Sequence, residues 1–125
     1  MPQQSDASAV VAAFNDAINR ADLVALAALM TDGHAFIDSA GGRVAGKAAC
    51  LAAWRGFFAA FPDYCNTFER VVTKGDIVVI AGRSRCSDPR LDGPALWRAL
   101  VQGALIGEWR VYADIEENRA RLGLV

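Results

Sequence analysis

The stretch YCNTFERVVTKGDIVVIAGRSRC, Tyr64–Cys86, decides the fold, because here the period of the sequence changes from about 3.6 residues to 2. We expect strands over Tyr64–Thr73 and Ile77–Cys86. The three residues between them, Lys74-Gly75-Asp76, include a glycine and are typical of a hairpin connection. The stretch therefore predicts two antiparallel strands that lie side by side.

The chain that follows repeats this pattern after a turn-rich break at residues 87–94. Ala95–Gln102 and Leu105–Tyr112 are predicted to form a second hairpin around Gly103. Beyond Asp114 the tail is charged and ends in apolar residues, and we assign it neither helix nor strand.

The first half of the chain carries helix signals instead. Ser5 or Asp6 is suited to cap a first helix. Asp22 is suited to cap a second, alanine-rich helix that closes at residues 31–33. The apolar residues at helical spacing are Val10, Val11, Phe14, Ala17 and Ile18 in the first helix and Leu23, Leu26, Leu29 and Met30 in the second.

A short strand and a third helix complete this half. His34–Asp38 is predicted to be a strand that enters a turn at Ser39–Gly42. A third helix begins at Gly46 or Lys47 and is stopped by Pro62. Its large apolar residues recur at three- and four-residue steps: Leu51, Trp54, Phe58 and Phe61.

Helices followed by strands predict an α+β fold, with three N-terminal helices packed on one face of a curved, mostly antiparallel sheet. Because the helices are few, the sheet can close around them as a cone with a pocket inside, where a small ligand would bind. The 125 residues carry no internal repeat or linker, so we expect one domain over residues 1–125 with its core at about 8–118.

Charge and apolar content exclude several classes of function. Thirteen Lys and Arg against fourteen Asp and Glu leave no basic excess for nucleic-acid binding. No apolar run reaches the roughly 18 residues of a membrane span, and the N-terminus lacks the basic region of a secretory signal. We expect a cytoplasmic protein that binds neither nucleic acid nor membrane.

The cysteine and histidine content argues against a metal or a disulfide framework. Cys50, Cys65 and Cys86 are odd in number and form no CxxC pair, and His34 is the only histidine. We expect three thiols in a reducing compartment, no metal site and no cofactor.

Four strings in order carry a resemblance to a known family: ALAALMTDGHAFID at 25–38, GKAACLAAW at 46–54, FPDY at 61–64 and GEWRVYAD at 107–114. Together they resemble the nuclear transport factor 2-like superfamily, and within it the ketosteroid isomerase and polyketide cyclase (SnoaL-like) branch. The resemblance covers about residues 8–118 and implies a cone-shaped, cystatin-like roll. Because this fold hosts enzymes, binding modules and transport factors, it specifies the reaction only weakly.

The resemblance also implies roles for single residues. Asp38 matches the aspartate that acts as general base in ketosteroid isomerases. The enolate-stabilising tyrosine of those enzymes falls on Phe14, and their protonated aspartate falls on or near Leu96. With both donors missing, steroid isomerisation itself is not expected.

Strand alternation, placed by the same resemblance, predicts a charged pocket. The residues expected to face it from the strands are Arg83, Arg85, Leu96, Arg98, Glu108, Tyr112 and Asp114. Phe14, Trp54 and Phe58 are expected to contact the ligand from the helices, with Trp54 in place of a pocket-floor tyrosine. An arginine of this set would clamp a ligand carboxylate or stabilise an enolate.

The leading hypothesis is proton transfer on a hydrophobic carbonyl compound by an isomerase, cyclase or hydratase, with Asp38 as base and His34 or Asp114 assisting. One alternative is an Asp38–arginine–Asp114 set like that of limonene epoxide hydrolases. Others are a binding module for a hydrophobic carboxylate and an interaction domain like the transport factors. Each residue also has a structural interpretation, since Asp38 suits a turn cap and Arg83 an exposed edge charge.

A homodimer is expected because the superfamily commonly dimerises through the outer face of the sheet. Trp109 is on the opposite parity from Tyr112, so it is predicted to lie on that face. An exposed tryptophan usually marks an interface. Trp109, with Trp97 beside it, is therefore the predicted dimer contact.

Overall fold

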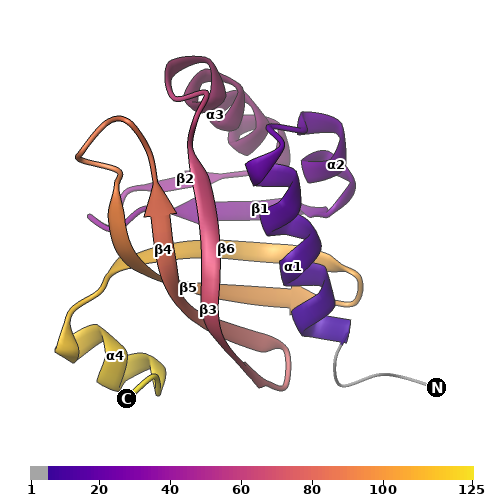
Figure 1. The fold of residues 1–125 in the computed structure, drawn as a ribbon. Helices are drawn as coiled ribbons and strands as arrows, with labels where there is room; N and C mark the ends of the chain where they lie inside the picture. Colours follow the sequence, from indigo (N-terminus) through magenta and orange to yellow (C-terminus); the bar gives the residue numbers. More distant parts are fainter. Residues whose placement is uncertain (1–5) are drawn as a thin grey trace.

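The computed structural model describes residues 6–125, which form one six-stranded sheet with four helices (Figure 1). The strands are β1 (Met30–Ile37), β2 (Arg43–Ala45), β3 (Cys65–Lys74), β4 (Ile77–Arg85), β5 (Gly93–Gln102) and β6 (Leu105–Ala113). The helices are α1 (Asp6–Asn19), α2 (Leu23–Ala28), α3 (Lys47–Ala60) and α4 (Glu116–Leu122). The strand order is β2-β1-β6-β5-β4-β3, and only the β1–β6 pair is parallel.

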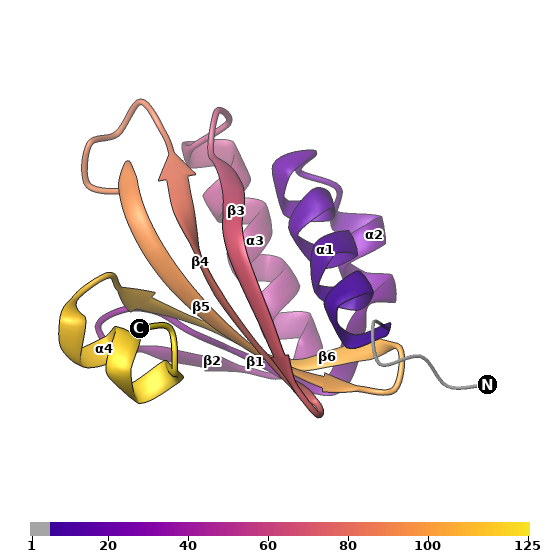
Figure 2. The ribbon, with the colours of Figure 1, turned by 60° about the horizontal axis from the view of Figure 1, so that its bottom comes forward.

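The sheet has two faces with different covers. Helices α1, α2 and α3 lie on one side of the curved sheet, and α4 lies on the other (Figure 2). We call these the inner and the outer face. The α+β fold with three N-terminal helices on a curved, mostly antiparallel sheet is confirmed.

The helix ends follow the local sequence signals. The Asp22 carboxylate accepts a hydrogen bond from the Ala25 N–H at 3.0 Å, which confirms it as the cap of α2. The predicted α1 cap, Ser5, lies outside the described residues, and α1 begins at Asp6. The extension of α2 through Met30 was wrong: the Leu29 carbonyl accepts from the Ile106 N–H at 2.7 Å, so strand pairing with β6 begins there.

The C-terminal tail holds the element that the sequence analysis missed. Residues Glu116–Leu122 form a helix with acidic residues in its first turn and arginines in its last, as the helix dipole favours. Gly123 ends it in the left-handed region, at φ +73°. Leu122 and Leu124 are buried against the outer face. Strand β2 was also missed, because the sequence analysis assigned no element to residues 43–45, between the predicted turn and the third helix.

Two apolar clusters hold the sheet between its covers. The inner cluster includes Phe14, Ile18, Trp97, Ile106 and Trp109, and helices α1–α3 contribute to it. The outer cluster is smaller and consists of Val79, Ala81, Leu96, Tyr112, Leu122 and Leu124. In residues 6–125, no helix is long and apolar enough to cross a membrane.

Candidate ligand-binding cavity

A cavity of about 340 Å³ lies between α3, the inner face of the sheet and the loop that joins β4 to β5. Its wall comprises Phe36, Asp38, Ser39, Val44, Cys50, Ala53, Trp54, Phe57, Tyr64, Leu91, Trp97, Trp109 and Val111. Mostly apolar walls with a few polar groups are typical of small-molecule sites of this size. The cone therefore encloses a pocket, but its wall is mostly apolar and not charged as the sequence analysis predicts.

Aromatic rings on α3 form one side of the wall. The Trp54 ring packs edge-on against Phe36 and Phe57, with centroid separations of 5.6 Å in both cases. Phe58 stacks on Trp54 at 5.3 Å but is not part of the wall itself. The helical spacing of these residues places their rings on one side of α3, so a ligand would meet a rigid aromatic surface.

Asp38 stands at the end of β1, exposed at the cavity rim. Its Oδ1 accepts hydrogen bonds from the N–H groups of Ala40 at 2.9 Å and Gly42 at 2.8 Å. These bonds close the turn between β1 and β2, which is the structural role weighed for this residue. Its Oδ2 makes no hydrogen bond within residues 6–125, and this oxygen is available to a ligand.

Tyr64 contributes the cavity wall's one phenolic hydroxyl. That hydroxyl lies 3.3 Å from Ser84 Oγ, and the Ser84 hydroxyl donates to Asn66 Oδ1 at 2.8 Å. Since the single Ser84 proton goes to Asn66, Ser84 accepts from Tyr64. Burial raises the pKa of Tyr64, while hydrogen bonds to Ser84 and Asn66 oppose that rise. The phenol is therefore a neutral donor.

His34 is fully buried behind the cavity and is not part of its wall. Its Nδ1 lies 2.7 Å from the Ile106 carbonyl oxygen, so Nδ1 carries the proton and donates. Burial lowers the pKa of His34, against the opposing effects of the Ile106 bond and of Glu108. A neutral imidazole packed 5.6 Å from the Phe14 ring holds β1 against the core.

The predicted facing of β5 and β6 was wrong by one residue. Trp97, Trp109 and Val111 face the cavity, whereas Arg98 and Glu108 lie on the outer face. Leu96 and Tyr112 belong to the outer cluster, and Arg83 and Arg85 are exposed on the outer side of β4. Burying charged side chains inside this cone costs more than burying aromatic ones, so the aromatic set is inside.

The corrected facing removes three specific expectations. Trp109 is 1% exposed and Trp97 is fully buried, so their placement as dimer contacts was wrong, and dimerisation itself stays a prediction. Among residues 6–125, no arginine lies in the cavity wall to clamp a carboxylate. Asp114 pairs with Arg119 at 2.6 and 2.9 Å and is absent from the wall, so it forms no set with Asp38.

Of the predicted site residues, only Asp38 and Trp54 line the cavity. Phe14 is fully buried behind it, 4.6 Å from the Trp109 ring. Sequence reasoning missed Tyr64 and Trp97 as wall residues. The alternation of aromatic with charged residues in Glu108-Trp109-Arg110-Val111 was the available signal, because polar residues of a half-buried strand face outward.

The SnoaL-like domain family matches residues 11–114 of this chain. The chain belongs to that family. The resemblance found in the sequence is thereby confirmed, as is the nuclear transport factor 2-like fold. No protein of curated function matches the sequence.

Solved structures agree with this SnoaL-like assignment. A candidate polyketide cyclase from Sinorhizobium meliloti has a TM-score of 0.76 at 19% identity, over 88% of this chain and 99% of that one. An uncharacterised cystatin-fold protein from Novosphingobium aromaticivorans has a TM-score of 0.74 at 18% identity, over 86% of this chain and 97% of that one. A candidate ketosteroid isomerase from Kribbella flavida has a TM-score of 0.74 at 16% identity, over 94% of this chain and 87% of that one. At these identities the likeness establishes the fold.

Proposed function

We propose that this SnoaL-like protein is a small-molecule enzyme of the isomerase or cyclase type, which moves a proton on a hydrophobic carbonyl compound bound in the cavity. One observation carries the proposal: among the described residues, the carboxylate of Asp38 is the one charged group in the wall of a mostly apolar and aromatic cavity. A carboxylate beside an apolar ligand suits proton abstraction next to a carbonyl group. The names of the cyclase- and isomerase-type neighbours support the same class.

In this mechanism Asp38 Oδ2 takes the proton from the carbon next to the carbonyl group. The electron pair of the broken C–H bond moves onto the carbonyl oxygen and forms an enolate. Tyr64 would hydrogen-bond this oxygen once its single hydroxyl proton turns from Ser84 Oγ toward the ligand. Return of the proton from Asp38 to another carbon of a conjugated enolate completes an isomerisation. In a cyclisation the enolate carbon attacks a second carbonyl group of the compound, and the alkoxide that forms takes the proton back from Asp38.

A second function is favoured by the position of Asp38. Its Oδ1 is held by two backbone N–H groups and the residue is exposed, so the carboxylate serves to close the turn at the cavity rim. A cavity that binds a neutral apolar ligand without reaction fits this observation. The corrected wall contains no arginine, so a carboxylate ligand is not part of this alternative.

Hydrogen exchange in a small ketone separates the two functions. The bicyclic ketone 2-tetralone would be incubated in D₂O with the protein, and loss of its α-hydrogen signals would be followed by NMR. We expect Asp38→Asn to slow the exchange at least about 100-fold, since a positioned base contributes about that much. Asn retains the oxygen that accepts from Ala40 and Gly42, so the turn remains intact. Tyr64→Phe should slow exchange about 10- to 100-fold.

The control is Asp32→Asn, which changes an exposed carboxylate that is not part of the cavity wall. Thermal shift with 2-tetralone is measured in parallel for every variant. Binding that persists in all variants with no protein-dependent exchange would establish the binding module instead. If neither binding nor exchange is detected with 2-tetralone and larger cyclic ketones, both versions of the proposal fail.

A further inference from the structure

Three arginines lie in one row across the outer face of the sheet. In the strand register, Ile37 of β1 stands opposite Arg43 of β2 on one side and opposite Arg110 of β6 on the other. Arg110 in turn stands opposite Arg98 of β5. Directly opposite residues share a face, with Cβ atoms about 5 Å apart. The row therefore reads Arg43, Ile37, Arg110, Arg98.

The row has too few acidic partners. Arg98 donates to Glu108 through one hydrogen bond of 3.0 Å. Arg43 and Arg110 have no ion pair in the part of the chain that the structure describes. The Arg110 guanidinium lies 4.8 Å from the centre of the Tyr112 ring, and its Nε is buried without a hydrogen-bond partner. Three cations thus share one carboxylate, and two of them face each other directly.

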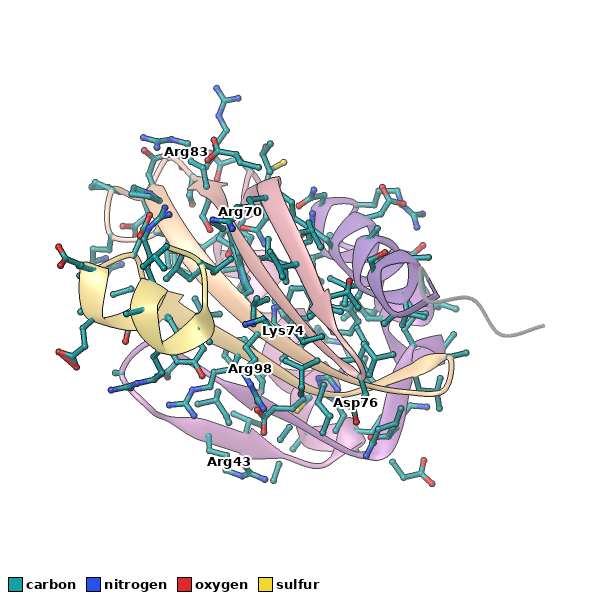
Figure 3. All side chains as sticks on the ribbon, turned by 90° about the horizontal axis from the view of Figure 1, so that it is seen from below. Arg43, Arg70, Lys74, Asp76, Arg83 and Arg98 are labelled. Carbon is teal, nitrogen blue, oxygen red and sulfur yellow. The ribbon has the colours of Figure 1, made fainter. Side chains whose placement is uncertain are left out.

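Two further basic residues of this face have hydrogen-bond partners in the C-terminal segment. Arg70 donates to the carbonyl groups of Leu124 and Val125, and Lys74 donates to that of Leu122. These bonds hold the C-terminal segment over the outer cluster. Figure 3 shows this face, with Arg98 and Arg43 to the side of α4. The row beside α4 therefore brings three arginines together with one carboxylate, whereas Arg83 and Arg85 lie on β4 outside the row.

We propose that Arg43, Arg98 and Arg110 form a binding site for the phosphate or carboxylate group of a small molecule. Like charges placed directly opposite each other destabilise a sheet, and a buried donor without a partner adds a further cost. An anion with two or more oxygens removes the first of these costs. The planar guanidinium group suits a phosphate or carboxylate, because each arginine can donate two parallel hydrogen bonds to two oxygens of the anion.

This anion site lies on the opposite face of the sheet from the cavity. Ile37, buried in the middle of the row, gives the site an apolar floor between Arg43 and Arg110. The site does not depend on the proposed enzymatic function, and loss of either leaves the other intact. The clustering of arginines in this row does not follow from a general excess of basic residues, because the net charge of the whole chain is −1.

Titration of the full chain with inorganic phosphate tests the site. The Nε–H signals of arginine would be followed by ¹⁵N NMR at constant ionic strength, with chloride as the reference salt. We expect a saturable shift of the Arg110 and Arg98 signals. Arg110→Gln should weaken phosphate binding at least about tenfold, as the loss of a bidentate charged contact requires. Arg98→Gln should weaken it by a similar factor.

Arg83→Gln is the matched control, since Arg83 is exposed on the same face but stands opposite Pro94 and Thr67, outside the row. Its phosphate affinity should remain within about twofold of the unchanged protein. Equal weakening by Arg83→Gln and Arg110→Gln would mean an adventitious ion only and would overturn the site. Should Arg110→Gln fail to fold, Arg98→Gln and Arg43→Gln decide the question.

Further experiments distinguish a small-molecule anion from a lipid headgroup and from a second copy of the chain. Acetate and a soluble phosphomonoester that compete with phosphate would support a small-molecule site. Binding only to phosphatidylglycerol vesicles would replace the proposal with a membrane surface. If the row is instead covered by a second copy, sedimentation would show a dimer that Arg110→Gln dissociates, and phosphate would produce no saturable shift.

Discussion

The two faces of the sheet are formed by the same strands but differ in the side chains they carry and in what covers them. On β6, Trp109 and Val111 face inward, while Glu108 and Arg110 face outward. The inner face meets three helices and still encloses a cavity of about 340 Å³. The outer face is covered in part by a helix of seven residues, and its charges lie beside that helix.

The difference shows where this chain leaves room for a ligand. The apolar residues of the outer face are sealed by Leu122 and Leu124 of the chain itself. On the inner face, large rings meet at angles of 71° and 88° around Trp54, and such edge-on packing leaves space between them. A small fold can therefore hold a binding cavity and remain stable because the opposite face carries its own cover.

Replacing each of two neighbouring residues on β6 by alanine gives the sharpest test of the difference between the inner and the outer face. We expect Trp109→Ala to lower the free energy of unfolding by about 3–5 kcal/mol, because it removes a buried ring from the inner cluster. Arg110→Ala, on the outer face of the same strand, should cost about 1 kcal/mol or less. Urea denaturation measures both. Equal losses would contradict the comparison, since they would mean that the two faces do not differ in how tightly they are packed.

Much of the fold could be predicted from the sequence, since its signals are local. The two-residue period placed β3 to β6 within two residues of their observed ends, and the Asp22 cap placed the start of α2. Helix α4 was missed because seven residues are too few to show a helical period. Its helix depends on contact with the outer cluster, which is not encoded within the tail itself.

The cavity could be predicted only in part. Asp38 and Trp54 were found because the family resemblance fixes their positions directly. The strand residues depend on parity, and a shift of one residue moves every side chain to the opposite face. Placing Leu96 at the site instead of Trp97 made that shift. The plain rule that apolar residues face the core would have corrected it.

Truncating a side chain that covers the outer face should lower the free energy of unfolding less than truncating one in the inner cluster. Leu124 is fully buried, so Leu124→Ala should lower the free energy of unfolding by about 2–4 kcal/mol. Val125, the next residue, is 82% exposed, and Val125→Ala should leave stability unchanged. Thermal and urea unfolding of the two variants provide the measurement. A null result for Leu124→Ala would show that α4 is not a necessary cover.

An ion pair between Asp114 and Arg119 also contributes to this cover, and its effect depends on pH. The Arg119 guanidinium holds the pKa of the Asp114 carboxyl below its ordinary value of 3.8, chiefly through their hydrogen bonds. A carboxyl whose pKa is lower in the folded state stabilises the fold above its ordinary pKa. That stabilisation is lost as the pH falls through the lowered value. Asp114→Asn should therefore cost about 1 kcal/mol or less at pH 7 and progressively less below pH 4. Urea denaturation at pH 7, 4 and 3 checks this, and a difference between the variant and the unchanged protein that stays constant over this range would mean that the pair does not anchor α4.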